Sequence, residues 1–293
     1  MKPHHLLLLV LVNMMWGLNL LTTKIGVREI PPIFFSGLRL AIMLLVCLPW
    51  LRWFPGQMAN LLRVALFTGV GGFGLLALGL GLSKDVSTVA IFTQLVVPFS
   101  VLLSVLMLGE VIHWRRKAGI ALAFIGVLII GFDPRAFSYL PGLICVALQG
   151  LSAALGMIYV KRLRGINPMQ LQAWISAMAL PVILALSWVF ESHPLTAVLS
   201  AGYAAWGAVL MAAIGSSLVG QSGFFYLLKR YPVSSVAPLT VLSTVFGMIG
   251  GVLVNHDVLT GRMLSGGALT LAGVVIIELR TKSKALEPVD SAR

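Results

Sequence analysis

Val86-Ser87-Thr88-Val89-Ala90 is matched 147 positions later by Val233-Ser234-Ser235-Val236-Ala237. The two copies extend without a gap over residues 82–130 and 229–277, and 18 of these 49 positions are identical. Each copy is long enough for about two membrane-spanning helices of about 20 residues. A long internal repeat indicates the architecture more directly than any single motif. The sequence therefore predicts a chain built from two copies of one structural unit.

The composition predicts an integral membrane protein. Hydrophobic residues make up 59% of the chain and charged residues 10%, with a mean hydropathy of +1.00. Soluble domains carry about a quarter charged residues. The net charge of +12 is not gathered into a basic patch with interleaved aromatic residues, which nucleic-acid binding would require. We therefore expect the lipid bilayer as a partner and no nucleic acid.

Apolar stretches of about 20 residues predict ten transmembrane helices and an all-α fold. Their ranges are 6–25, 33–51, 62–82, 86–108, 117–132, 139–160, 170–190, 204–228, 234–254 and 262–279. Five spans per half is an odd number, so the halves cross the bilayer in opposite directions. This predicts a five-plus-five inverted-topology repeat around a central cavity. We expect one five-helix repeat in residues 1–136, the second in 137–280, and a disordered cytoplasmic tail in 281–293.

Lysine and arginine in the connections predict the orientation in the membrane. One set of alternating connections, with both termini, holds 15 of these residues, and the other set holds 5. Since basic residues accumulate on the cytoplasmic side, both termini are expected in the cytoplasm of a bacterial cell, with the protein in the inner membrane. Arg39 is the remaining basic residue and lies inside a span.

No pattern of catalytic or metal-binding residues is visible. There is no His-Glu-x-x-His motif, and no serine, histidine and aspartate set can be argued from spacing. All nine acidic residues lie in connections, tails or the last turn of a span. We expect no enzyme activity, no cofactor and no metal. Because a proton-coupled antiporter usually keeps a carboxylate inside the membrane, the pattern favours neutral or zwitterionic solutes.

Arg39 has three possible interpretations. It lies about two turns from Pro32, near the outer side of the predicted topology. Its side chain can extend toward the outer interface, as long basic side chains do near helix ends. It can instead bind the carboxylate of a substrate, or form an interhelical hydrogen bond that holds the fold.

Polar side chains inside the spans are the other candidates for a cavity wall, because facing lipid would be costly. For the hydroxyls the alternative is helix–helix hydrogen bonding, and for Pro98 it is a packing kink rather than a gate. The candidates besides Arg39 are Trp16, Asn19, Thr93, Gln94, Pro98, Gln149, Gln221, Tyr226 and Thr240.

The chain resembles the drug/metabolite transporter superfamily, specifically its EamA type. The resemblance covers about residues 6–279, and its motifs are weak singly and specific together. They are Trp16-Gly17 with Lys24, Pro31-Pro32 with Phe35 and Arg39, Pro98, Leu108-Gly109-Glu110, and the Gly119…Gly126-Val127 pattern.

The second half departs from the family pattern. Asn255-His256-Asp257 stands where Leu-Gly-Glu would recur, and Val245 replaces the proline that matches Pro98. These departures put equal behaviour of the two halves in doubt.

The resemblance implies a ten-helix basket whose central cavity is lined by spans 1, 3, 4, 6, 8 and 9, with spans 5 and 10 at the periphery. It also implies export of amino acids and related metabolites, and in some members of drugs. The small four-helix relatives that expel cations use a glutamate in their first span, and this chain has none there.

The function expected from the sequence is export of amino acids or similar small metabolites by alternating access. The alternative is efflux of hydrophobic or cationic drugs, held by aromatic residues of the same cavity. An intramembrane enzyme or a non-transporting scaffold is a third possibility, and no catalytic set or protruding domain supports it. The expected partner is a small-molecule solute. The sequence does not fix the oligomeric state, and a monomer is compatible with it.

Overall fold

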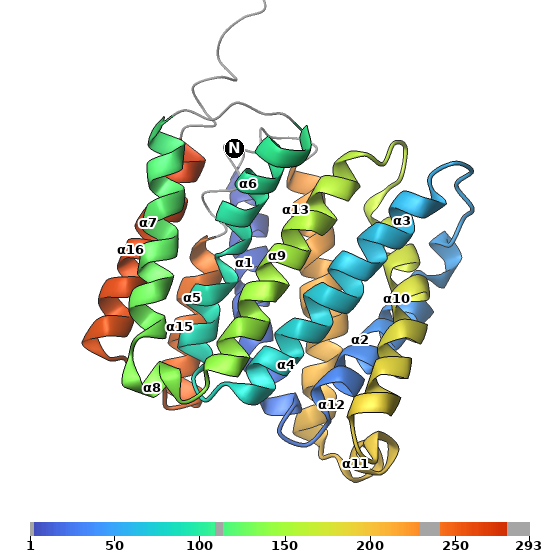
Figure 1. Ribbon diagram of the computed structural model, residues 1–293. Helices are drawn as coiled ribbons and strands as arrows, with labels where there is room; N and C mark the ends of the chain where they lie inside the picture. Colours follow the sequence, from blue (N-terminus) through green and yellow to red (C-terminus); the bar gives the residue numbers. More distant parts are fainter. Residues whose placement is uncertain (1–2, 109–113, 229–240, 280–293) are drawn as a thin grey trace, which may run out of the picture.

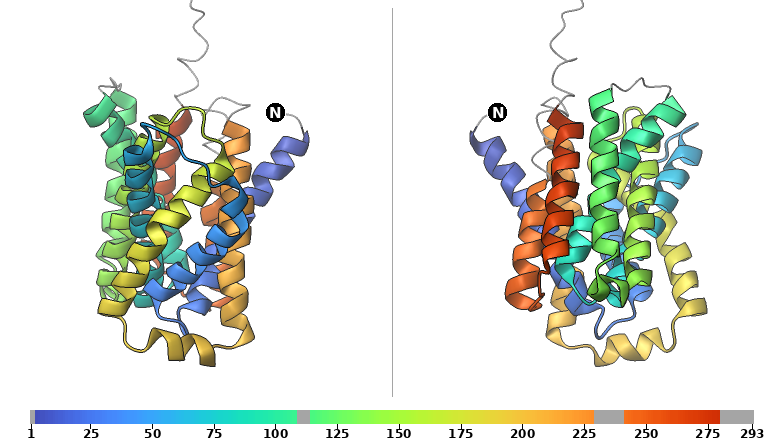
Figure 2. Two further views of the ribbon diagram at one scale, coloured as in Figure 1. Left: turned by 90° about the vertical axis from the view of Figure 1, so that its right-hand side faces the viewer. Right: turned by 60° about the vertical axis from the view of Figure 1, so that its left-hand side comes forward.

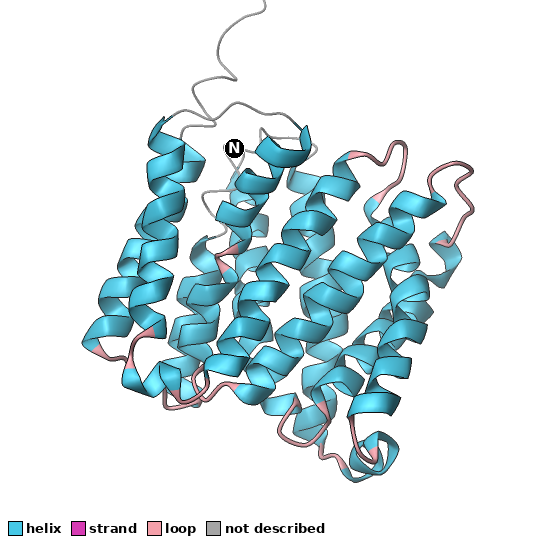
Figure 3. Ribbon diagram, in the orientation of Figure 1, coloured by secondary structure: helices cyan, strands magenta, loops and turns pink. Residues whose placement is uncertain are grey.

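The computed structural model describes residues 3–108, 114–228 and 241–279, and all regular structure in these ranges is helical (Figure 3). Seven helices are long and apolar enough to cross a membrane. Three shorter apolar helices, at 117–131, 241–254 and 261–277, complete the ten that the sequence predicts. The start of the ninth span and the tail expected at 281–293 lie outside the described residues.

The first five spans follow the ranges expected from the sequence closely. They are formed by α1 (Pro3–Gly26), α2 (Pro32–Cys47) with the 3₁₀ turn η1 (Leu48–Trp50), α3 (Met58–Val64) with η2 (Ala65–Gly74) and α4 (Leu75–Leu82), α5 (Val86–Thr93) with α6 (Val96–Leu108), and α7 (Trp114–Gly131).

The last five spans begin after a short connecting helix, and a second short helix lies between spans seven and eight. The elements are α8 (Pro134–Phe137), α9 (Leu140–Lys161), α10 (Pro168–Phe190), α11 (Pro194–Ser200), α12 (Tyr203–Leu210) with η3 (Met211–Gln221) and α13 (Ser222–Leu228), α15 (Val241–Val254), and α16 (Gly261–Leu279).

The helices pack as an inverted repeat. Span one begins at the end of the bundle that holds the N-terminus, whereas α9, which begins the second half, starts at the opposite end (Figure 1). We name these the N-terminal end and the far end. α2 packs on α10 and α7 on α16, while α1 packs on α15 and η3 as α9 packs on α6 and η2. Exchanging the halves reproduces this set of pairs, as a two-fold axis in the membrane plane requires.

The pair formed by α7 and α16 stands at one side of the bundle (Figures 1 and 2). This is the peripheral position that the resemblance implies for spans 5 and 10. The described connections at 51–57 and 162–167 lie at the N-terminal end, and those at 27–31, 83–85, 132–139, 191–202 and 255–260 lie at the far end (Figure 1).

Spans three and eight share an irregularity that the sequence pattern did not predict. The middle of each is π-helical: η2 and η3 begin 146 residues apart, at Ala65 and Met211, and end 147 residues apart, at Gly74 and Gln221. These offsets agree with the 147-residue offset of the sequence repeat to within one residue, so the feature belongs to both copies. π-helical turns are rare and occur frequently at functional sites.

Glycines of the repeat form the contact between α7 and α16. A Cβ added at Gly126 would lie 2.5 Å from the carbonyl oxygen of Gly266, and one added at Gly273 would lie 2.6 Å from that of Gly119. The repeat places Gly119 on Gly266 and Gly126 on Gly273. Each copy therefore supplies the same two glycines, and these let the helix backbones approach closely, as small residues do between membrane helices.

We predict that Gly126→Ala destabilises the protein, because the added methyl group would meet the backbone of α16. Forcing extra atoms into a packed contact costs about 1–3 kcal/mol. Thermal unfolding in detergent measures the effect as a lowered Tm. Gly131→Ala is the matched control, since nothing lies within 4 Å of a Cβ there. Equal melting temperatures of the two variants would contradict the prediction.

Candidate functional site

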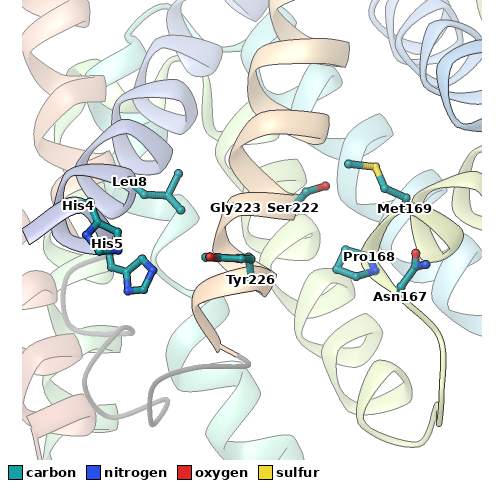
Figure 4. A pocket seen from close by; sticks show the side chains of 9 residues that line it. All are labelled: His4, His5, Leu8, Asn167, Pro168, Met169, Ser222, Gly223 and Tyr226. Carbon is teal, nitrogen blue, oxygen red and sulfur yellow. The ribbon is translucent and has the colours of Figure 1, made fainter. Parts of the chain in front are cut away.

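A pocket of about 530 Å³ opens at the N-terminal end between α1, α10 and α13 (Figure 4). Its lining residues are His4, His5, Leu8, Asn167, Pro168, Met169, Ser222, Gly223 and Tyr226. Tyr226, a predicted site residue, is exposed here, and its ring lies 5.8 Å from that of His5. α10 forms one wall, although the resemblance does not place span seven among the cavity-lining spans.

Two walls of the pocket join deeper in the bundle at Ser216 and Ser217 of η3. From α1, Trp16 Nε1 donates a hydrogen bond to the Ser216 carbonyl oxygen at 3.3 Å. From α10, Gln172 Nε2 donates to the Ser217 carbonyl oxygen at 3.2 Å. η3 leads directly into α13, the third wall, so these contacts lie beneath the pocket.

Arg39 of α2 binds the same serine pair. Its Nε and Nη2 donate to Ser217 Oγ at 3.0 and 2.7 Å, and Nη2 also donates to Ser216 Oγ at 3.4 Å. The guanidinium carbon lies 3.9 Å from the centre of the Phe73 ring in η2. Arg39 is therefore held between the two π-helical segments. We call Arg39, Phe73, Gln172, Ser216 and Ser217 the Arg39 cluster.

The Arg39 side chain does not extend toward the outer interface, because only 5% of its surface is exposed and its partners are inside the bundle. Of the three interpretations, the interhelical hydrogen bond is present, and binding of a carboxylate stays a prediction. Within the described ranges no carboxylate pairs with Arg39, and Nη1 has no acceptor. A cation inside a membrane is costly, which makes such a residue a candidate functional group.

Several buried polar atoms have no hydrogen-bond partner among the described residues, and two of them, Thr23 Oγ1 and Ser83 Oγ, lie at the far end. Among the sequence candidates these are Asn19 Oδ1 and Gln149 Oε1, and the same holds for Gln172 Oε1 and Ser222 Oγ. Gln221, at the end of η3, is half-buried. Buried polar groups are nearly always paired with protein or water, so these atoms indicate space for water or a polar solute.

The predicted residues of span four have local or structural partners. Thr93 Oγ1 donates to Ala90 O of its own helix at 2.7 Å, and Gln94 Nε2 donates to Thr244 Oγ1 of α15. The helix of this span is interrupted between Thr93 and Val96. Because Pro98 has no N–H, it cannot donate to the Gln94 carbonyl four residues earlier, and that carbonyl accepts from Val97 N at 3.0 Å instead.

The two halves differ at this point. The described part of span nine, Val241–Val254, is helical, and Val245 there replaces the proline; the residues that match α5 lie outside the described residues. Thr240 lies outside the described residues.

Sequence reasoning missed Gln172. The residue lies one turn into the 23-residue apolar helix α10 and is fully buried. A large polar residue inside a predicted span was the available signal, since facing lipid would be costly. Ser216 and Ser217 gave the same signal, and only their contact with Arg39 separates them from other intramembrane hydroxyls.

At the far end, carboxylates cross-link the two halves. Glu191 accepts from Ile33 N and Phe34 N at 2.6 and 2.8 Å, where α2 begins. Asp257 accepts from Ser87 N at 2.6 Å, where α5 begins. These side chains act as caps of helix N-termini, although they come from the other half of the chain.

Two further carboxylates make the same kind of cross-link. Glu29 accepts from Gly202 N at 2.6 Å, where α12 begins. Asp133 accepts from Thr260 Oγ1 at 2.5 Å, across the junction of the halves. The acids that the sequence places in connections therefore join the halves at the end opposite the pocket.

Lys24 is the centre of a second set of polar contacts at the far end. Its ammonium donates to the carbonyl oxygens of Leu80, at 2.8 Å, and Ser83, where α4 ends. Nearby, Tyr139 donates to Asp85. Burial raises the pKa of Asp85, the Tyr139 hydrogen bond opposes this, and the charge of Asp257 adds to it. Burial and the bond to Asp85 raise the pKa of Tyr139. This end is closed by polar contacts.

Comparison with known proteins assigns the fold to a family. The model of the EamA-like transporter family matches residues 5–132 and 140–279. The chain belongs to the EamA-like transporter family. An EamA-like chain is a multi-pass membrane transporter, and the inverted repeat of ten helices accords with its two matched segments.

Named relatives of this EamA-like chain include transporters of several organisms. The "Probable amino-acid metabolite efflux pump" of Salmonella typhimurium is 26% identical over 92% of this chain and 93% of its own length. A protein of the same name from Escherichia coli is also 26% identical, with the same coverage. The "Uncharacterized transporter YoaV" of Bacillus subtilis is 24% identical over 90% of this chain and 92% of its own.

A solved crystal structure has the same fold. It superposes with a TM-score of 0.61 and 18% identity, and the match covers 94% of this chain and 98% of the other.

We predict that Glu191→Ala destabilises the EamA-like protein, because two N–H groups at the start of α2 would lose their acceptor. Loss of a helix cap costs about 0.5–2 kcal/mol. Thermal unfolding in detergent measures the lowered Tm. Glu191→Gln keeps one acceptor oxygen and should lose less. An Ala variant as stable as the wild type would show that these contacts do not hold the far end.

Proposed function

We propose that this transporter exports amino acids or related small zwitterionic metabolites from the bacterial cytoplasm by alternating access. Arg39 is the observation that carries this proposal. It is a buried cation beneath the pocket, and two of its N–H donors have no acceptor among the described residues. A carboxylate is the natural ligand of a guanidinium, and the pair forms strong charge-assisted hydrogen bonds.

The names of the relatives support the same solute class. The proteins of Salmonella typhimurium and Escherichia coli are named as probable efflux pumps of amino-acid metabolites. The buried positive charge also counts against the alternative, efflux of cationic drugs. Phe73, an aromatic side chain suited to a cation, already stacks on Arg39.

The two ends of the bundle support alternating access. The pocket opens at the N-terminal end. The distribution of basic residues predicts that this end faces the cytoplasm when the protein lies in the inner membrane. The far end is cross-linked by Glu191, Asp257 and Glu29. This combination fits an inward-open state, and release outside would require those contacts to break.

Transport in liposomes tests the solute class. Purified protein is reconstituted into vesicles loaded with labelled neutral amino acids, and their exit is followed. We expect at least one neutral amino acid to leave faster than from vesicles without protein. If none does, the proposed solute class is wrong.

Arg39→Lys should reduce this transport by about tenfold or more at equal abundance. Lysine keeps the charge but lacks the planar fork that binds a serine hydroxyl and a carboxylate together. The measurement is initial rate against amino-acid concentration, with abundance checked by size-exclusion profile. Ser100→Ala is the control, since its hydroxyl bonds only Val97 O of its own helix at 2.8 Å. Wild-type rates in the Lys variant would remove Arg39 from the binding site.

A further inference from the structure

Gln172 presents a hydrogen-bond acceptor that the protein leaves unused. The side chain has no exposed surface. Its Nε2 donates to Ser217 O at 3.2 Å, which orients the amide, and its Oε1 is buried without a partner. Large buried amides normally satisfy both ends, so an unpaired oxygen at this depth needs a donor from outside the described chain.

Arg39 and Gln172 bind the same residue, Ser217, through other atoms than the ones they leave unused. Arg39 Nη2 binds the Ser217 hydroxyl at 2.7 Å, while Gln172 binds the carbonyl of the same serine. Nη1 of Arg39 has no acceptor among the described residues. A solute that satisfies both must carry an anionic acceptor and an N–H donor.

The pocket leads toward this pair. Met169 lines the pocket and lies three positions before Gln172, on the same face of α10. Ser222 lines the opposite wall, five positions after Ser217, and its Oγ is also unpartnered. Figure 4 shows the Ser222 and Met169 side chains pointing toward one another. Gln172 does not line the pocket, so a solute would reach it only after side chains such as the flexible Met169 are displaced.

We propose that Gln172 Oε1 accepts a hydrogen bond from the ammonium group of a solute whose carboxylate is bound by Arg39. This assignment rests on the proposed function. It makes Gln172 a specificity residue: the site selects an amino acid over the same carboxylic acid without its amine. The discrimination arises because the acid alone leaves the amide oxygen buried and unpaired, and buried polar groups left unpaired reject analogues strongly.

Competition in proteoliposomes tests the assignment. Exit of the fastest labelled amino acid is measured with unlabelled leucine or 4-methylpentanoate, and with phenylalanine or 3-phenylpropanoate, as competitors. For wild type we expect each amino acid to compete at a concentration at least about tenfold lower than its amine-free acid. In Gln172→Met this ratio should fall toward one, mainly because the amino acid competes less well.

One variant controls for structural effects. Ser176→Ala lies one turn further along α10, where the hydroxyl bonds Gln172 O at 2.6 Å, and should leave the ratio unchanged.

The outcomes separate the two proposals. A wild-type protein that moves amino acids without discriminating against the amine-free acids overturns the role of Gln172, and this arm needs no variant. An unchanged ratio in Gln172→Met overturns it as well, while the exporter proposal stands. If wild type moves no amino acid, the proposed function itself fails. A ratio lost in Gln172→Met and kept in Ser176→Ala supports the assignment.

Discussion

A buried guanidinium without a carboxylate partner is the constraint on which the centre of this protein depends. Arg39 can stay charged there only if polar atoms replace the water it has lost. Two serine hydroxyls and one aromatic ring do so among the described residues. Arg39 lies in α2 and these partners lie in η2 and η3, so one side chain joins both halves of the repeat and both of its π-helical segments.

The two ends of the bundle use polar groups differently. At the far end, the carboxylates of Glu191 and Asp257 accept hydrogen bonds from backbone N–H groups at helix N-termini of the opposite half. At the N-terminal end, a pocket leads toward atoms that have no partner, such as Ser222 Oγ and Gln172 Oε1. Carboxylates join the two halves at the far end, whereas the pocket opens at the N-terminal end, where the Ser222 hydroxyl has no partner among the described residues. This contrast is the physical basis for an inward-open state in the proposed cycle.

The repeat explains the contact between α7 and α16 but not the arrangement of spans four and nine. Gly119, Gly126, Gly266 and Gly273 interlock because the copies supply identical glycines to one contact. At spans four and nine the copies differ in sequence: Pro98 lies just after the break between α5 and α6, and Val245 takes its place in α15. The halves are therefore identical at these glycines and different at this position of spans four and nine.

The sequence by itself determined the ten apolar spans, the inverted repeat and the side on which basic residues gather. These follow from local quantities: the length of apolar runs, set by the thickness of the hydrocarbon core, and the residue types of the connections. Tertiary structure alone decided which polar groups meet. Arg39 and Ser217 are 178 positions apart, Trp16 and Ser216 are 200, and no local pattern encodes such pairings. The unpaired Oε1 of Gln172 likewise became visible only in the tertiary structure, because whether an atom has a partner depends on its neighbours in space.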